Sequence, residues 1–192
     1  MFELFQLNLH KSKNATALLC DGFKNEFIYL LTEPHVNGKG ELPGFPCNVN
    51  VYKNSTNTRS CIVSSRNQKL WLNPNFSARD TTTCLWKTEY TGLPEIYLCT
   101  VYLDILNNDD DNFFPKEFIR VVNYCNKNKK PLVVCMDSNS HSELWGLETN
   151  PRGKIMEDFI FANNLILENV GKEATFIGRE CETRVDITLK CN

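Results

Sequence analysis

Polar side chains suited to acid–base and hydrogen-bonding chemistry recur where apolar, strand-like runs of this chain end. Asn8 ends the first run, Glu33 follows the second, and Tyr102 lies at the end of another. The run VVCM is followed directly by Asp137 and then by Asn139. Strand ends are rigid supports beside accessible loops, so active sites of sheet-rich proteins gather there. These residues could therefore meet in one crevice, where a carboxylate accepts a proton and amide and phenol groups donate hydrogen bonds.

Two further residues belong to this pattern. Asp186 interrupts the apolar run RVDITL, and a carboxylate in such a run requires a hydrogen-bonding partner or a shifted pKa. His141 occupies the loop after Asn139 and is ambiguous, whereas His10 and His35 are interpreted as exposed loop residues. Taken singly, each polar residue has an ordinary explanation, such as a turn or a half-buried strand tyrosine. Taken together, they favour a functional crevice.

Apolar periodicity predicts the elements that must position these residues. Helices are predicted over residues 11–24, 114–126 and 152–163, with apolar side chains on one face of each. Strands are predicted over residues 4–9, 27–31, 48–52, 60–64, 82–87, 96–103, 131–136, 166–167, 175–177 and 184–189. Strands outnumber helices and the helices fall between them, which favours packed sheets with helices outside. No repeat, low-complexity segment or linker is visible, so residues 1–192 are expected to form one domain.

The composition is that of an ordinary globular protein. The 192 residues are 42% hydrophobic and 23% charged, with a formal net charge of −2. The chain lacks the basic excess common in strong nucleic-acid binders. Any anionic ligand must therefore be held locally, by a few cations or a metal ion, and not by the field of the whole protein.

The cysteines point to a reduced protein. The nine cysteines form no CxxC pair, which gives little support for a zinc site. Most lie in strand-like runs, where a reduced cysteine packs as a small apolar side chain. The opening segment MFELFQLNLH is too short and too polar for a secretory or membrane-spanning segment. These features indicate an intracellular protein, nuclear or cytoplasmic, without a membrane partner.

Seven segments of the chain resemble, in the same order, motifs of the endonuclease/exonuclease/phosphatase superfamily. They are QLNLHKS, LLTEPHV, CTVYL, VVCMDSNSHSELWG, NPRGKIMEDFI, ATF and TRVDITL. The segment DSNSHSELWG looks most like the apurinic-type endonuclease domain of R1-like non-LTR retrotransposons. The resemblance covers nearly the whole chain. It implies an α/β fold in which a two-sheet β sandwich is flanked by helices.

The resemblance also implies roles for individual residues. Glu33 matches the acidic metal ligand, and Asn8 lies in the motif that organises the metal and the phosphate. Tyr102 matches a tyrosine that contacts the scissile phosphate. Asp137 matches the acid that orients or deprotonates the attacking water, and Asn139 matches its companion amide. The implied cofactor is Mg²⁺, with Mn²⁺ as an alternative, because hard carboxylate oxygens suit these ions.

Other matches concern the substrate side and the end of the chain. His141 and Trp145 lie in a loop that shapes the site of retrotransposon enzymes, and Thr183 stands where many relatives carry serine. Asp186 matches an acid that holds a catalytic histidine in one tautomer. The family ends with a Ser-Asp-His motif on a further strand, and we expect this single domain to be a C-terminally truncated form without that strand. None of the three histidines matches the missing one, so the sequence gives Asp186 no evident partner.

The implied function is that of a Mg²⁺-dependent phosphodiesterase, a DNA endonuclease that nicks target DNA in retrotransposition. A reverse transcriptase domain is expected in the parent reading frame. The missing motif leaves open a second interpretation, a catalytically inactive relic or binding module that keeps the fold. A third keeps the chemistry on another phosphoester, because one fold hosts many substrates. The WG-containing loop favours DNA.

Overall fold

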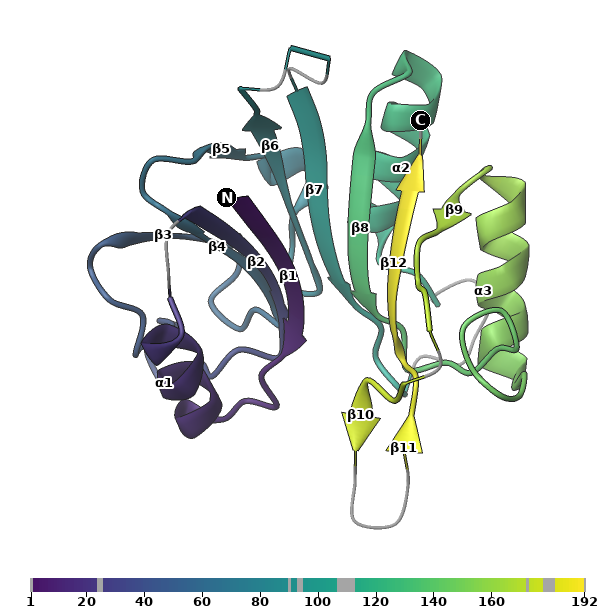
Figure 1. Ribbon diagram of the computed structural model, residues 1–192, viewed down its shortest axis with the longest axis horizontal. Coiled ribbons are helices and arrows are strands. Elements are labelled where there is room, and N and C mark those ends of the chain that lie inside the picture. Colours follow the sequence, from purple (N-terminus) through teal and green to yellow (C-terminus); the bar gives the residue numbers. More distant parts are fainter. Residues whose placement is uncertain are drawn as a thin grey trace.

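The computed structural model describes residues 2–23, 26–89, 91–92, 95–106, 113–171, 173–177 and 182–191. In this part of the chain the strands form a four-stranded sheet, a six-stranded sheet and a small two-stranded sheet (Figure 1). The two large sheets pack face to face, and helices lie on their outer sides. The predicted α/β sandwich flanked by helices is therefore confirmed.

The four-stranded sheet has the order β1-β2-β4-β3. β1 (Phe2–Asn8) runs parallel to β2 (Glu26–Thr32), and α1 (Lys13–Asp21) connects the two strands. β4 (Ser60–Ser65) is antiparallel to β2 and to β3 (Val49–Tyr52). Because β1 and β2 are parallel neighbours, their carboxyl ends emerge at the same edge of the sheet.

The six-stranded sheet has the order β5-β6-β7-β8-β12-β9. Its strands are β5 (Lys69–Leu72), β6 (Thr81–Lys87), β7 (Glu95–Tyr102), β8 (Leu132–Asp137), β9 (Ile166–Leu167) and β12 (Asp186–Cys191). β7 and β8 are parallel and joined through α2 (Lys116–Asn128), and β12 is antiparallel to β8. α3 (Pro151–Ala162) follows β8, and the small sheet pairs β10 (Phe176–Ile177) with β11 (Glu182–Thr183).

Both faces of β2 are buried, which explains its continuous apolar sequence. Ile28 and Leu30 pack between the two large sheets with Leu98 of β7. Tyr29 and Leu31 belong to the cluster on the opposite face, which side chains of α1 cover. Side chains alternate between the two faces of a strand, so a strand covered on both sides needs apolar residues throughout. The residue that follows β2 is thereby attached to a rigid core element.

The helices α2 and α3 cover the outer face of the six-stranded sheet (Figure 1). Phe118 and Val122 of α2 and Ile160 of α3 join one buried cluster with Val134 and Met136 of β8. These helical residues recur at the spacing that places apolar side chains on one face. β8 is therefore apolar on both sides until it reaches its last residue.

The structure differs from the predicted elements in a few places. The sequence pattern does not predict β5, β11 or the short 3₁₀ turn Pro74–Phe76, which are brief and partly exposed. The predicted strand over residues 184–189 begins instead at Asp186 and extends to Cys191. Asp186 is therefore the first residue of a strand and not a charge in its middle, which places its carboxylate at the edge of the core.

The cysteines in the described residues are free thiols, and most of them are buried. Burial raises the pKa of Cys61 and of Cys99 to about 12, so these thiols stay protonated and pack as small apolar groups. Within the described ranges, the helices lack the combined length and apolar character that a bilayer span requires.

Candidate active site

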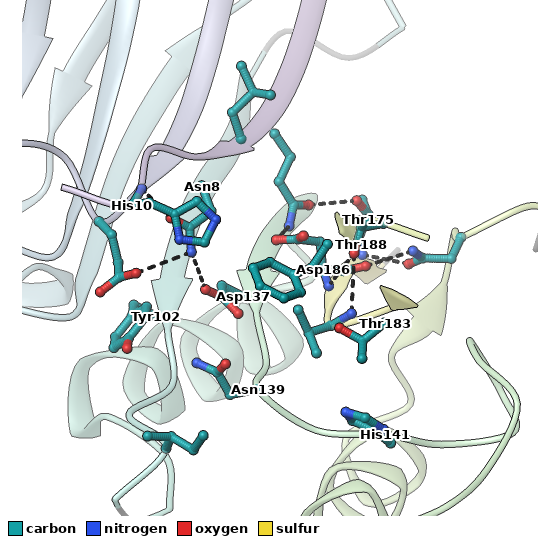
Figure 2. A pocket seen from close by; sticks show the side chains of 17 residues that line it. Asn8, His10, Tyr102, Asp137, Asn139, His141, Thr175, Thr183, Asp186 and Thr188 are labelled. Carbon is teal, nitrogen blue, oxygen red and sulfur yellow. Dashed lines mark hydrogen bonds between the residues drawn. The ribbon is translucent and has the colours of Figure 1, made fainter. Parts of the chain in front are cut away.

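The carboxyl ends of β1, β2, β7 and β8 border one pocket of about 610 Å³ (Figure 2). Among the residues that the structure describes, the predicted site residues that line it are Asn8, Glu33, Tyr102, Asp137, Asn139, His141, Thr183 and Asp186. Residues from both large sheets and from the small β10–β11 sheet thus contribute to a single cavity. The convergence expected from the strand ends is present.

Three of these residues form a row across the six-stranded sheet. Tyr102 is the register partner of Asp137 on the parallel strands β7 and β8. Asp186 is the register partner of Asp137 on the antiparallel strands β8 and β12. Residues opposite each other on neighbouring strands point to the same face, so one phenol and two carboxylates are presented side by side.

Asn8 connects the two large sheets at the pocket. Its Nδ2 donates a hydrogen bond to Asp137 Oδ2 at 2.6 Å and lies 3.5 Å from Glu33 Oε2. Its Oδ1 accepts the backbone N–H of His10 at 2.7 Å, which fixes which way the amide faces. Figure 2 shows the hydrogen bond between the side chains of Asn8 and Asp137. The end of β1 is thereby linked to the end of β8.

Glu33 is held by its backbone and by a neighbouring cation. Its N–H donates to the carbonyl of Arg59 at 2.8 Å, and its own carbonyl accepts the N–H of Lys11 at 2.7 Å. The Lys11 ammonium lies 3.0 Å from Glu33 Oε1. The carboxylate is therefore fixed at the pocket and partly neutralised.

Left-handed backbone conformations gather around this pocket. Four of the six described non-glycine residues with a left-handed φ, namely His10, Lys11, Glu33 and Asn139, lie at or beside the pocket with φ between 44° and 55°. The other two, Lys129 and Asn164, lie at the C-terminal ends of helices. Such conformations are costly for residues with a Cβ, and they persist where the surroundings hold them in place. At Asn139 the side-chain Nδ2 donates to the Leu103 carbonyl at 2.8 Å. This concentration of strain is typical of a functional site.

Asp137 is the most perturbed carboxyl group of the pocket. Its side chain is buried, and Oδ1 has no hydrogen-bond partner among the described residues. Burial raises its pKa to about 7, and the negative charges of Asp186 and Glu33 act in the same direction. Hydrogen bonds from Asn8 and from the backbone of Asn139 oppose this shift. A carboxyl group with a pKa near neutrality is suited to exchange a proton with a reacting water.

Asp186 is held by neighbours from other elements. Burial raises its pKa, whereas hydrogen bonds from Thr175 and Gln6 lower it. Gln6 Nε2 lies 3.3 Å from Asp186 Oδ1 and donates to the Met136 carbonyl at 3.0 Å. Asp186 therefore has an amide partner and a hydroxyl partner, neither of which the sequence indicated.

Tyr102 remains a neutral phenol at physiological pH. Burial raises its pKa to about 12, with further contributions from the negative charges of Glu33 and Asp137. A protonated phenol at this position donates a hydrogen bond and does not add another negative charge. It is suited to contact an anionic oxygen in the pocket.

The comparison with family models identifies the chain. The model of the family described as "Endonuclease-reverse transcriptase" matches residues 96–192. The chain belongs to this family. The matched segment of this endonuclease/exonuclease/phosphatase superfamily member contains Tyr102, Asp137, Asn139 and Asp186, whereas Asn8 and Glu33 precede it. No curated protein matches the chain significantly.

Solved structures share the fold of this family member. The endonuclease domain of TRAS1, a telomere-specific non-LTR retrotransposon, has a TM-score of 0.74 and 21% identity, covering 96% of this chain and 82% of that chain. An endonuclease/exonuclease/phosphatase family protein from Bacteroides thetaiotaomicron has a TM-score of 0.60 and 10% identity, covering 97% of this chain and 81% of that chain. The 3′ phosphatase NExo from Neisseria, bound to a product DNA hairpin, has a TM-score of 0.55 and 10% identity, covering 97% of this chain and 84% of that chain.

Trp145 is the predicted site residue that the structure places outside the pocket. Its side chain is 5% exposed and packs in the core cluster beneath α3. The indole N–H donates to the Ser140 carbonyl at 3.3 Å. Trp145 was predicted to contact the substrate, but its side chain does not line the pocket. It anchors the loop of residues 138–150, which carries Asn139 and His141.

The Arg152-Gly153 pair of this endonuclease-type domain also supports that loop. Arg152 Nε donates to the Asn139 carbonyl at 2.8 Å, and its guanidinium lies 4.7 Å from the Phe113 ring centroid. A Cβ added at Gly153 would lie 1.6 Å from the His141 carbonyl oxygen. The glycine is therefore required by a close backbone approach between α3 and the loop.

Nine of the described residues that line the pocket were not predicted as site residues, and Gln6 and His10 are among them. Gln6 lies two positions before Asn8 on the same face of β1, so strand alternation was the available signal. His10 is exposed and lies in a loop, as predicted, and it also lines the pocket, with its ring centroid 5.5 Å from that of Phe176. No local pattern indicates that contact, because it joins segments far apart in the sequence.

The oxygen atoms at the pocket suit the divalent metal ion that the resemblance implies. Within the described residues, no three His, Cys, Asp or Glu side chains lie close enough to hold a metal by themselves. Mg²⁺, however, keeps several waters and usually takes one or two carboxylates together with substrate phosphate. Glu33 and the orphan Oδ1 of Asp137 provide carboxylate oxygens for such a site, and Asn8 holds the two carboxylates near each other through its Nδ2. The residues present fit a hard divalent cation with an incomplete protein shell.

Proposed function

We propose that this chain is a Mg²⁺-dependent DNA endonuclease that nicks one strand by hydrolysing a phosphodiester bond. The observation that carries the proposal is the junction of Asn8, Glu33 and Asp137 in one pocket, with Tyr102 next to Asp137 in register. Hydrolysis of a phosphodiester needs a positioned water, a group that accepts its proton and donors for the developing negative charge. Each of these requirements has a residue in the pocket.

Asp137 is the group proposed to orient the water and accept its proton. Its pKa is raised to about 7 in the metal-free chain, and a divalent cation bound nearby would lower it, which favours the carboxylate form that accepts a proton. Asn8 holds Oδ2 by a hydrogen bond and leaves Oδ1 without a protein partner. That free oxygen is the atom proposed to face the water or the metal shell. Asp186 is proposed as the acidic neighbour that raises the proton affinity of Asp137.

Tyr102 and Asn139 are proposed to contact the phosphate. The neutral phenol of Tyr102 is a donor for a non-bridging oxygen, and the amide of Asn139 is the companion polar group at the end of β8. Glu33 would hold Mg²⁺, or Mn²⁺ in its place, and Asn8 would organise the site by holding the carboxylates of Glu33 and Asp137. When bound, such an ion supplies Lewis acidity toward the phosphoryl oxygen. His141 and Thr183 line the pocket and are proposed to contact the substrate.

DNA is proposed as the substrate from the family and from the fold. The family model carries the description "Endonuclease-reverse transcriptase", which supports a link to a reverse transcriptase in the parent reading frame. The similar TRAS1 domain belongs to a retrotransposon. Because its net charge is −2, the chain is expected to make few ionic contacts with DNA phosphates outside the pocket and to bind DNA weakly there.

The decisive experiment is nicking of supercoiled plasmid by the purified chain. Conversion to open circles is expected with Mg²⁺, and it is expected to stop with EDTA or in Asp137→Ala. The matched control is Asp158→Ala, because Asp158 is an exposed helical carboxylate paired with Lys154. Loss of cleavage in the control as well would point to unfolding. A wild-type chain without any nicking, while it remains folded and binds Mg²⁺, would support the inactive binding module.

The third interpretation is tested in the same preparation. A chain that leaves plasmid intact but hydrolyses a small diester such as bis(p-nitrophenyl) phosphate, with loss of activity in Asp137→Ala, would be a phosphodiesterase for another substrate. A chain that cleaves both would support the endonuclease proposal.

A further inference from the structure

Arg59 forms a partly buried ionic network beside the candidate active site. It directly precedes β4, and its side chain is 12% exposed. Its Nε and Nη2 donate to the two carboxylate oxygens of Asp80 at 2.5 and 2.7 Å. Its Nη1 donates to Asp104 Oδ2 at 2.5 Å. The guanidinium is therefore fixed in one plane by a two-pronged contact and a third hydrogen bond.

This guanidinium lies over the ring of Tyr102. Arg59 Cζ lies 4.5 Å from the centroid of the Tyr102 ring, within the range of a cation–π contact. Both acidic partners of Arg59 are also linked to the segment of chain that carries Tyr102. The Asp80 carbonyl accepts the Tyr102 N–H at 2.9 Å, and Asp104 follows Tyr102 by two positions. The Tyr102 ring, the end of β7 and the Arg59 guanidinium are therefore held together by these contacts.

The backbone of Arg59 reaches a second residue of the site. Its carbonyl accepts the N–H of Glu33 at 2.8 Å, and Glu33 has a left-handed φ of 46°. Arg59 thereby joins the residue that follows β2 to the last residue of β7, which belong to different sheets. Its side chain lines a neighbouring cavity and not the pocket that holds Asp137, so it does not touch the proposed reaction centre.

We infer that Arg59 is a positioning residue, which holds the Tyr102 ring so that its hydroxyl faces the phosphate. The inference rests on the proposed function, because it assigns Tyr102 a contact with the reacting group. Two carboxylates hold the guanidinium, and a planar cation on the face of a phenol restricts rotation of that ring. Lysine keeps the charge but has neither the fork that binds Asp80 nor the flat face that stacks on Tyr102.

The first test is a double-mutant cycle on nicking rate. Arg59→Lys and Tyr102→Phe are each expected to lower kcat by about tenfold or more, the size of effect of a lost transition-state hydrogen bond. The double variant is expected to be no slower than Tyr102→Phe, because Arg59 acts through the hydroxyl that is already gone. Two independent losses that multiply would overturn the inference. KM is expected to change less than kcat in Arg59→Lys.

The second test does not need activity. In protein labelled with 3-fluorotyrosine, the Tyr102 ¹⁹F resonance is assigned by its loss in Tyr102→Phe. In Arg59→Lys this resonance is expected to shift or broaden, whereas the matched control Arg66→Lys leaves it in place. Arg66 is an exposed arginine at the opposite end of β4. An unchanged Tyr102 resonance in Arg59→Lys would overturn the inference, whatever the activity.

The two tests separate this inference from the proposed function. A wild-type chain that does not nick DNA contradicts the function, while a shifted resonance still supports the role of Arg59. If Arg59→Lys fails to fold, Asp104→Asn serves as the second variant, since it weakens one contact and leaves the Asp80 fork intact. It is expected to move the Tyr102 resonance in the same direction by a smaller amount, and no movement would overturn the inference.

Discussion

Asp137 and Asp186 are register partners at the pocket end of two adjacent antiparallel strands, β8 and β12. Burial and the charge of Asp186 raise the pKa of Asp137, and burial raises the pKa of Asp186. Two carboxyl groups in this arrangement resist simultaneous ionisation, so the apparent pKa values belong to the pair. A bound cation or a shared proton would relieve the repulsion, which links metal binding, pH and stability in this pocket.

The first prediction concerns stability of the metal-free protein as a function of pH. A raised carboxyl pKa means that the folded state keeps a proton that the unfolded chain has already released. The free energy of unfolding should therefore fall as pH rises from about 4, the pKa of Asp137 in the unfolded chain, to about 7, its pKa in the folded chain. Asp137→Asn removes the ionisation and should be more stable than wild type at pH 8, by about 1–3 kcal/mol.

Urea denaturation in EDTA at pH 5 and pH 8 measures this difference. Asp158→Asn is the control, because its carboxylate is 67% exposed and should leave the pH dependence unchanged. A wild-type protein with equal stability at both pH values, or an Asp137→Asn protein with the wild-type slope, would contradict the raised pKa.

The second prediction concerns stabilisation by the proposed cofactor. Mg²⁺ that binds only the folded chain should raise its stability by about 2.7 kcal/mol at a hundred times the Kd. Glu33→Gln should abolish most of this gain, because an amide oxygen is a weaker ligand for Mg²⁺ than a carboxylate. Thermal unfolding with and without Mg²⁺ at pH 8 provides the measurement.

Glu168→Gln is the matched control for that experiment. Glu168 pairs with Lys190 at 2.8 Å on the surface, as Glu33 pairs with Lys11 at 3.0 Å, but it lies outside the pocket. An equal Mg²⁺ response in wild type and Glu33→Gln would remove Glu33 from the metal site.

The third prediction separates anchoring by Trp145 from substrate contact. Trp145→Phe loses the hydrogen bond to Ser140 and part of the packing in the core. We expect the free energy of unfolding to fall by about 1–3 kcal/mol, while kcat/KM of the folded protein changes less than about threefold. Trp71→Phe, at a 49% exposed position, should change neither quantity. A large rise in KM without loss of stability would instead indicate that Trp145 contacts the substrate.

The fourth prediction concerns the contact between α3 and the active-site loop. Gly153→Ala would bring a methyl group into the His141 carbonyl, so either helix or loop must move. The cost is expected to be about 3 kcal/mol or more, at the upper end for an overpacked core position. Gly38→Ala, where nothing lies within 4 Å of the added Cβ, is the control and should cost far less. Denaturant unfolding of both variants decides the matter, and equal stabilities would rule out the close approach.

The sequence by itself determined most of the helices and strands, and which strand ends carry polar residues. The apolar run of β2 indicated a strand buried on both faces, and Glu33 after it marked the point where the strand leaves the core. The same reasoning applied to Asp137 at the end of β8. These features are readable because strand periodicity and burial are properties of a short segment of chain.

Tertiary structure alone decided which of these residues touch. The hydrogen bond from Asn8 to Asp137 joins two different sheets, and the pairing of Asp137 with Asp186 depends on the register between β8 and β12. The stacking of Arg59 on Tyr102 and the burial of Trp145 also depend on how distant segments pack. Sheet packing and strand register are set by the sum of many contacts between distant segments. No local pattern contains that sum, so the sequence supplied the chemical groups and the fold supplied their partners.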